Sequence, residues 1–229
     1  MQLNLTYKAL FFNQNRIRNI VFLCRILKFY YFTEHILQIK RIRRKLITVK
    51  SLDKDLAVFG ATSHHYKLQP KISKLRVIAF EKEYAIRLPE CYRSFLIHIG
   101  NGGAGPYQGL YELGHFDHFI EEATISYLNM ETVLTPETTK KQWNSLYEEA
   151  RTLKTDEAFE NKKAAAYAGI LFVAHCGCDS YLGIVLNGIH RGRLIRGYYD
   201  FFYAPSFFEA ANFLDFYEDW LNDILDKKN

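Results

Sequence analysis

The residues best suited to chemistry stand together in the stretch His175-Cys-Gly-Cys-Asp179. An imidazole, thiols and a carboxylate this close together could bind a metal ion, form a redox pair or supply a nucleophile. The same residues could also form nothing more than a tight bend between two strands. These interpretations differ in whether the chain is an enzyme.

The spacing of the possible ligands argues against a metal ion. A structural zinc site takes four ligands, normally as two close pairs. This chain has one Cys-x-Cys, while Cys24 and Cys91 are isolated and the pairs His64-His65 and His115-x-x-His118 lie in other segments. A disulfide between Cys176 and Cys178 would close a very small, strained ring. We therefore expect no metal ion and no cofactor.

The case for catalysis is equally weak. A nucleophilic cysteine needs a base that lowers its pKa, and His175, as the strand neighbour of Cys176, points to the opposite face. The glycine-rich Gly100–Gly105 follows a predicted helix, whereas a phosphate-binding loop follows a strand. We predict a protein that is not an enzyme, in which Gly177-Cys-Asp179 forms a bend. A metal- or thiol-dependent enzyme centred on Cys176 and Cys178 is the alternative.

Charge divides the chain into two parts. Residues 1–50 hold eleven Lys or Arg against Glu34 alone, a net charge of about +10. The totals of 30 basic and 25 acidic residues leave 19 and 24 for residues 51–229, a net charge of about −5. We predict a basic, aromatic extension over 1–50, a linker over 51–71 and one domain over 72–229. Nucleic acid or a membrane surface would be contacted only through residues 1–50.

Apolar spacing predicts the elements that position these residues. Helical periodicity marks 72–86, and a short helix opens at Pro89 and ends at Gly100, before a sharp reversal at Asn101-Gly-Gly103. Further expected elements are a strand near 107–113, irregular structure over 115–139, helices over 142–154 and 156–168, strands over 169–175, 180–186 and 192–200, and a helix over 206–226 with Ser206 and Glu209 as a capping box. This order predicts an α+β fold.

Three pieces of the sequence, taken in order, resemble one family. They are FEKEYAIRLPECYRSFLIHIGNGG, GILFVAHCGCDSYLGIVLNGIHRGRLI and FFEAANFLDFYEDWLNDIL, which together cover about 72–225. They are similar to the SUKH superfamily, the Smi/Knr-like cell-wall-assembly regulators. The resemblance implies a single domain with helices packed around a mixed, mostly antiparallel sheet. The residues that carry it, expected to be structural, are Leu88, Pro89, Tyr92, Phe95, Leu96, Asn101, Gly102, Gly103 and Gly177, with Asp179 beside them.

The resemblance also implies a function without catalysis. Its bacterial members look like immunity proteins that bind and neutralise a cognate polymorphic toxin, often a nuclease, and its fungal members look like regulatory scaffolds of cell-wall (glucan) synthesis. We expect the former, with a protein partner, no small-molecule substrate and a cytoplasmic location; the regulatory scaffold is the alternative. Acidic and aromatic residues in loops and strand ends are the expected partner-binding positions: Tyr107, Glu112, Asp117, Glu121, Glu122, Asp179, Tyr199 and Asp200.

Overall fold

The computed structural model describes residues 35–116 and 125–228. The chain divides into two compact units, Met1–Arg41 and Ile42–Asn229. Residues 35–41 of the first unit are helical, and residues 42–52 at the start of the second unit are helical as well. Within the described ranges, no helix has the length and apolarity needed to cross a membrane.

Short helices come first in the second unit. They are α2 (Ala61–His64), α3 (Lys74–Glu83) and α4 (Glu90–His98). α3 begins after Ser73, whose hydroxyl accepts a hydrogen bond from the backbone N–H of Arg76 at 3.2 Å. α4 follows Pro89, and its stripe of apolar residues is buried. Both α3 and α4 confirm helices that the sequence predicts.

Two further helices pack together before the sheet. α6 (Lys140–Arg151) begins with a capping box formed by Thr139 and Gln142, and α7 (Asp156–Ala166) begins at Thr155, whose side chain accepts from the N–H of Ala158. The predicted helices over 142–154 and 156–168 are therefore confirmed, with α6 starting slightly earlier because its capping box precedes the apolar pattern.

The sheet is a simple antiparallel meander. Its strands are β1 (Ile170–Gly177), β2 (Ser180–Val185), β3 (Leu194–Tyr198) and β4 (Ser206–Phe207), paired in chain order. Every pairing is antiparallel. The predicted α+β class is confirmed, and the sheet is entirely antiparallel rather than mixed.

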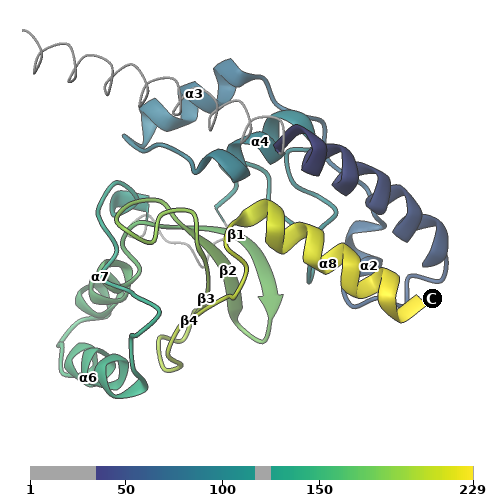
Figure 1. Cartoon of the computed structure of the whole chain (residues 1–229). Helices are drawn as coiled ribbons and strands as arrows, with labels where there is room; N and C mark the ends of the chain where they lie inside the picture. The colour runs from purple at the N-terminus through teal and green to yellow at the C-terminus, as the bar shows by residue number, and fades with distance from the viewer. Residues whose placement is uncertain (1–34, 117–124, 229) are drawn as a thin grey trace, which may run out of the picture. The chain divides into compact units, whose positions relative to one another are not determined.

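Helices cover both faces of this sheet, with α6 and α7 on one side and α4 and α8 (Phe213–Lys228) on the other (Figure 1). On the α6 side, the indole of Trp143 is fully buried and donates a 3.0 Å hydrogen bond to the carbonyl of Phe201. On the other side, Phe95 of α4 meets the rings of Phe213 and Tyr217 in α8. Aromatic residues thus hold the helical layers in place, as the aromatic-rich composition suggests.

The last helix begins later than the sequence predicts. Ser206 and Phe207 do not open a helix; they pair with Arg196 and Ile195 as β4. α8 starts only at Phe213, where the side chain of Asn212 accepts hydrogen bonds from the N–H groups of Leu214 and Asp215. Strand pairing at the sheet edge outweighs the capping-box pattern of Ser206 and Glu209. Asn212 acts as the N-cap of α8 instead.

No regular strand forms near 107–113, where the sequence predicts one. Its pairing consists of isolated bridges from Leu110 to Gly103 and to Ala174. Tyr107 and Gly109 both have positive φ angles, 58° and 97°, which turn the chain out of an extended path. The reversal predicted at Asn101-Gly-Gly103 is present, because Gly102 and Gly103 have φ angles of 90° and 86°.

Residues 51–71 fold within the second unit. They contain α2 and four buried side chains, those of Asp53, Ala61, His64 and Tyr66. The division into an extension over 1–50, a linker over 51–71 and a domain over 72–229 stays a prediction, since a division by contacts places its one boundary between Arg41 and Ile42.

Candidate functional site

The stretch His175-Cys-Gly-Cys-Asp179 forms the turn of a β-hairpin. Gly177 pairs with Ser180, so the loop consists of Cys178 and Asp179, with φ angles of 47° and 53°. Positive φ at both central positions is the geometry of a type I′ turn, which follows the natural twist of the strands. The structural interpretation of this stretch as a bend is confirmed.

The two thiols of the hairpin have opposite environments. Cys176 is buried, and burial raises the pKa of its thiol to about 12, although the nearby Arg196 works in the opposite direction. Cys178 is exposed at the tip. A thiol with so high a pKa is protonated and unreactive near neutral pH. Residues 35–116 and 125–228 bring together no group of three His, Cys, Asp or Glu side chains that could hold a metal ion.

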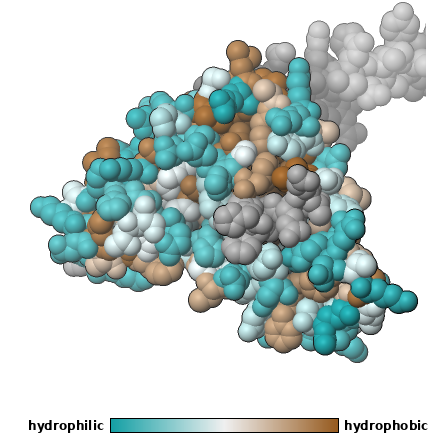
Figure 2. All heavy atoms as spheres, turned by 180° about the vertical axis from the view of Figure 1, so that it is seen from behind, coloured by the Kyte–Doolittle hydropathy of each residue, from teal (hydrophilic) through white to brown (hydrophobic). Residues whose placement is uncertain are grey.

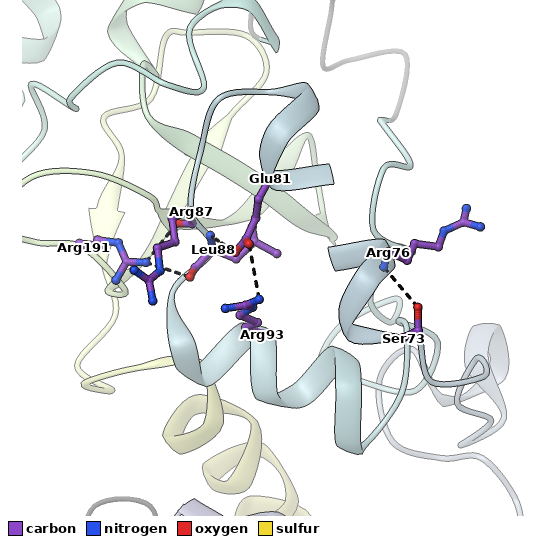
Figure 3. Close-up of polar contacts among 7 residues, drawn as sticks. All are labelled: Ser73, Arg76, Glu81, Arg87, Leu88, Arg93 and Arg191. Atoms are coloured by element: carbon purple, nitrogen blue, oxygen red, sulfur yellow. Dashed lines mark hydrogen bonds and ion pairs between the residues drawn. The ribbon is translucent and has the colours of Figure 1, made fainter. Parts of the chain in front are cut away.

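Charged side chains surround the Leu88-Pro-Glu90 motif and bond its backbone (Figure 3). Glu81 of α3 accepts a 3.0 Å hydrogen bond from the N–H of Leu88 and lies 3.6 Å from Arg93 of α4. From the β2–β3 turn, Arg191 donates to the carbonyls of Arg87 and Leu88 at 3.0 and 2.8 Å. The two bonds of Arg191 connect the second of the three family-like stretches of sequence to the first.

The other residues that carry the resemblance lie in the core or in turns. Leu88, Tyr92, Phe95 and Leu96 are almost completely buried. The side-chain oxygen of Asn101 accepts a 3.0 Å hydrogen bond from the N–H of Leu113, which fixes the loop after α4. Burial in the core and hydrogen bonds within loops are typical of residues that stabilise a fold.

The structure brings some of the predicted partner-binding residues together. The N–H of Tyr199 donates to the carbonyl of Asp179 at 2.9 Å, and Asp200 follows directly, so these three lie at one end of the sheet. The ring of Tyr199 is partly covered by Lys163, whose amine is 4.2 Å from the ring centre. Asp179 and Asp200 are exposed. Their role as an interface stays a prediction.

The remaining predicted positions lie apart from that end of the sheet. Tyr107 is half-buried, and its hydroxyl accepts a 2.7 Å hydrogen bond from Arg196 of β3. Glu112 is exposed in the loop after the Leu110 bridge. Asp117, Glu121 and Glu122 lie outside the residues that the structure describes.

A groove of about 530 Å³ runs along α8, and Tyr107 is the one residue lining it among the predicted partner-binding residues that fall within 35–116 and 125–228. One wall is a stripe of α8 side chains from Phe216 to Lys228, and the other is formed by the loops at 57–59 and 106–107. Phe59 is 62% exposed at its edge. The lining residues are Ala57, Val58, Phe59, Pro106, Tyr107, Phe216, Asp219, Trp220, Asp223, Ile224, Lys227 and Lys228.

A buried carboxylate fixes the wall opposite α8. Asp53 accepts hydrogen bonds from the N–H groups of Ala57 and Val58 and from the hydroxyl of Tyr66, at 3.0, 3.2 and 2.7 Å. Its other contact is the amine of Lys228, at 3.1 Å. Burial alone would raise the pKa of Asp53, but the hydrogen bonds from Tyr66, Lys228 and the backbone lower it on balance. An ionised Asp53 therefore ties the loop to the end of α8.

The middle of the groove is acidic. Burial raises the pKa of Asp219, and the nearby carboxylates of Asp215, Asp223 and Glu218 raise it further. Glu218 is paired with Lys45 at 2.7 Å, but no ion pair involves Asp219 or Asp223 within the described part of the chain. The groove can therefore offer apolar surface and unneutralised carboxylates to the same ligand.

Sequence reasoning missed this groove, although one signal for it was present. Phe216 and Trp220 lie four residues apart, are only half-buried and form a second apolar stripe beside the buried residues Leu214, Tyr217, Leu221 and Ile224. A helix that buries one face has no need of a second apolar stripe. The segment at 57–59 is apolar, but the polar and turn-forming residues around it predict a linker over 51–71.

The comparison with protein families agrees with this architecture. Residues 71–219 match the SMI1 / KNR4 family (SUKH-1). The match spans well over half of the chain and contains α3, α4, the whole sheet and the first part of α8. Neither a curated protein nor a solved structure gives a match. The chain therefore belongs to the SMI1 / KNR4 family.

Proposed function

We propose that this chain is a non-catalytic binding protein, an immunity protein that neutralises a cognate toxin by covering a surface that the toxin needs. The observation that carries the proposal is the family match over residues 71–219, together with the resemblance of bacterial SUKH proteins to toxin-binding immunity proteins. Such a protein acts by affinity and requires no catalytic group, cofactor or metal ion.

The chemistry of the described residues supports a binding role. The Leu88-Pro-Glu90 motif is held within the fold, because Glu81 and Arg191 both bond the backbone of Leu88. The thiol of Cys176 is buried with a raised pKa, which is the opposite of what a nucleophile needs. Nothing in this arrangement supports the alternative of a thiol-dependent enzyme.

The surface supports it as well. Hydrophilic side chains cover most of the face drawn in Figure 2, and apolar ones occur there in small groups. Phe59 is 62% exposed and lines a groove that also contains Trp220, and exposed aromatic residues of this kind anchor protein interfaces. The acidic charge of residues 51–229 would steer a basic partner, such as a nuclease, toward the domain.

Coexpression with a candidate toxin encoded next to this gene tests the proposal. We expect the two proteins to elute together in size-exclusion chromatography and the chain to restore growth of cells that produce the toxin. A chain that neither binds nor protects against that toxin would overturn the assignment. A gene neighbourhood of cell-wall synthesis enzymes would instead favour the regulatory scaffold.

A further inference from the structure

The groove along α8 has a fixed aromatic floor. The ring of Trp220 contacts the rings of Tyr66, Tyr217 and His64, with centroid distances of 6.4, 5.2 and 6.0 Å. These contacts hold the indole in one orientation while part of it lines the groove. A ring that is already ordered loses little conformational entropy when it binds a partner.

The loop that carries Phe59 is also held in place. Phe59 follows Val58, whose N–H is bonded to the buried Asp53. The ring of Phe59 extends toward the hairpin turn, where a Cβ added at Gly177 would lie 3.7 Å from its tip. Phe59 and Trp220 therefore both line this apolar slot on fixed supports.

The acidic residues of the groove favour a positively charged ligand. Asp219 and Asp223 lie one helical turn apart on the α8 stripe that lines the groove, directly beside Trp220. The basic lining residues Lys227 and Lys228 follow Asp223 at the C-terminal end of α8, and the amine of Lys228 is already bound by Asp53. Burial raises the pKa of Asp219 most, and the carboxylates of Asp215, Asp223 and Glu218 raise it further, although Lys45 works in the opposite direction. A positive charge placed between Asp219 and Asp223 would relieve this repulsion.

We propose that the groove binds a cationic, amphipathic segment of the partner protein, with an apolar side chain between Phe59 and Trp220 and an arginine or lysine between Asp219 and Asp223. This inference rests on the proposed function, and it names the part of the domain that meets the partner. A cationic face would also match the acidic charge of residues 51–229. The residues involved lie outside those that the sequence identified as partner-binding, apart from Tyr107 at the rim.

The first test is a selection with random peptides displayed on phage, using the immobilised full-length chain. We expect the enriched peptides to contain arginine or lysine next to aromatic or aliphatic residues. Synthetic copies should bind in fluorescence anisotropy, and the affinity should fall as sodium chloride is raised. Enrichment of acidic or uncharged peptides, or no enrichment, would overturn the inference.

Variants then locate the site of binding. Asp219→Asn/Asp223→Asn and, separately, Phe59→Ala should each weaken binding of the selected peptide by at least about tenfold. Asp226→Asn, an exposed acid on α8 outside the groove, and Leu75→Ala, an exposed apolar residue on α3, are matched controls and should leave it unchanged. Circular dichroism checks that all variants are folded. Equal affinity for the groove variants and the controls would contradict the assignment.

The same variants separate this inference from the proposed function. If the toxin binds the wild-type chain and the groove variants equally well, the immunity role stands and the groove is not its site. If cationic peptides bind in the groove but the chain neither binds nor neutralises the toxin, the groove assignment stands and the immunity role fails.

Discussion

The carboxylate of Asp53 lies 3.1 Å from the amine of Lys228, although the two residues stand near opposite ends of the second unit. The side chain of Asp53 is completely buried, whereas that of Lys228 is one third exposed. Tyr66 and two backbone N–H groups complete the shell of Asp53. This contact joins the segment before α3 to the C-terminal helix, and the groove lies between them.

Replacing Asp53 should therefore destabilise the domain. Asp53→Asn keeps the size of the side chain but removes the ion pair and one strong acceptor. We expect the free energy of unfolding to fall by about 2 kcal/mol, measured by urea denaturation. Asp55→Asn is the control, because Asp55 is exposed, and it should change the stability by less than about 0.5 kcal/mol. Equal effects of the two substitutions would show that the Asp53 contacts add nothing.

The same carboxylate predicts a dependence on pH. Because the pKa of Asp53 in the folded state is below its ordinary value of 3.8, ionised Asp53 stabilises the fold above that pH. The stabilisation is lost as the pH falls through the lower, folded-state pKa. The difference in unfolding free energy between the wild type and Asp53→Asn should thus be constant near neutrality and shrink below about pH 4. A difference that grows as the pH falls would give the opposite sign and contradict the shift.

Arg191 should matter for stability although it is exposed. It donates to the carbonyls of Arg87 and Leu88 and connects the β2–β3 turn to the start of α4. Arg191→Ala should lower the free energy of unfolding by about 1–2 kcal/mol. The control is Arg76→Ala, since the Arg76 side chain points away from these groups (Figure 3). A stability loss for Arg76→Ala as large as that for Arg191→Ala would remove the support for this link.

Substitutions at the hairpin tip can distinguish a structural role of Asp179 from a role in binding the partner. Both Cys178 and Asp179 have positive φ angles, for which Asn-Gly is the preferred pair. We expect Cys178→Asn/Asp179→Gly to raise the free energy of unfolding by about 0.5–1 kcal/mol, measured by urea denaturation. If Asp179 also contacts the partner, the more stable variant will bind it more weakly. A destabilised variant would show that the tip does not need this geometry.

Much of the fold could be predicted from the sequence, because local signals and tertiary contacts agree in most elements. The spacing of Tyr92, Phe95 and Leu96 predicts α4, and runs rich in β-branched and aromatic residues between turn residues predict β1 to β3. The start of α8 was predicted wrongly because Ser206 and Phe207 pair with β3, a contact made in space that no local pattern reveals. Asn212 offers an N-cap of the same chemical type as Ser206, so the sequence alone does not choose between them.

The groove was less accessible to sequence reasoning because it depends on a long-range contact. The pattern around residues 51–71 is polar and rich in turn-forming residues, which is typical of a linker. Only the structure shows that Asp53 is buried and that Lys228 contacts it, and that Phe59 and Trp220 line the same groove. Asp219 and Asp223 look like ordinary solvated charges until the loop across from them is known.

The most direct test of the central claim is the affinity of the purified full-length chain for the product of the neighbouring toxin gene, measured by isothermal titration calorimetry with wild type and Asp219→Asn/Asp223→Asn. The account predicts a complex with the wild type, loss of toxin activity on binding, and an affinity at least about tenfold weaker for the variant. A toxin that shows no binding to the wild-type chain and keeps its full activity in its presence would contradict it.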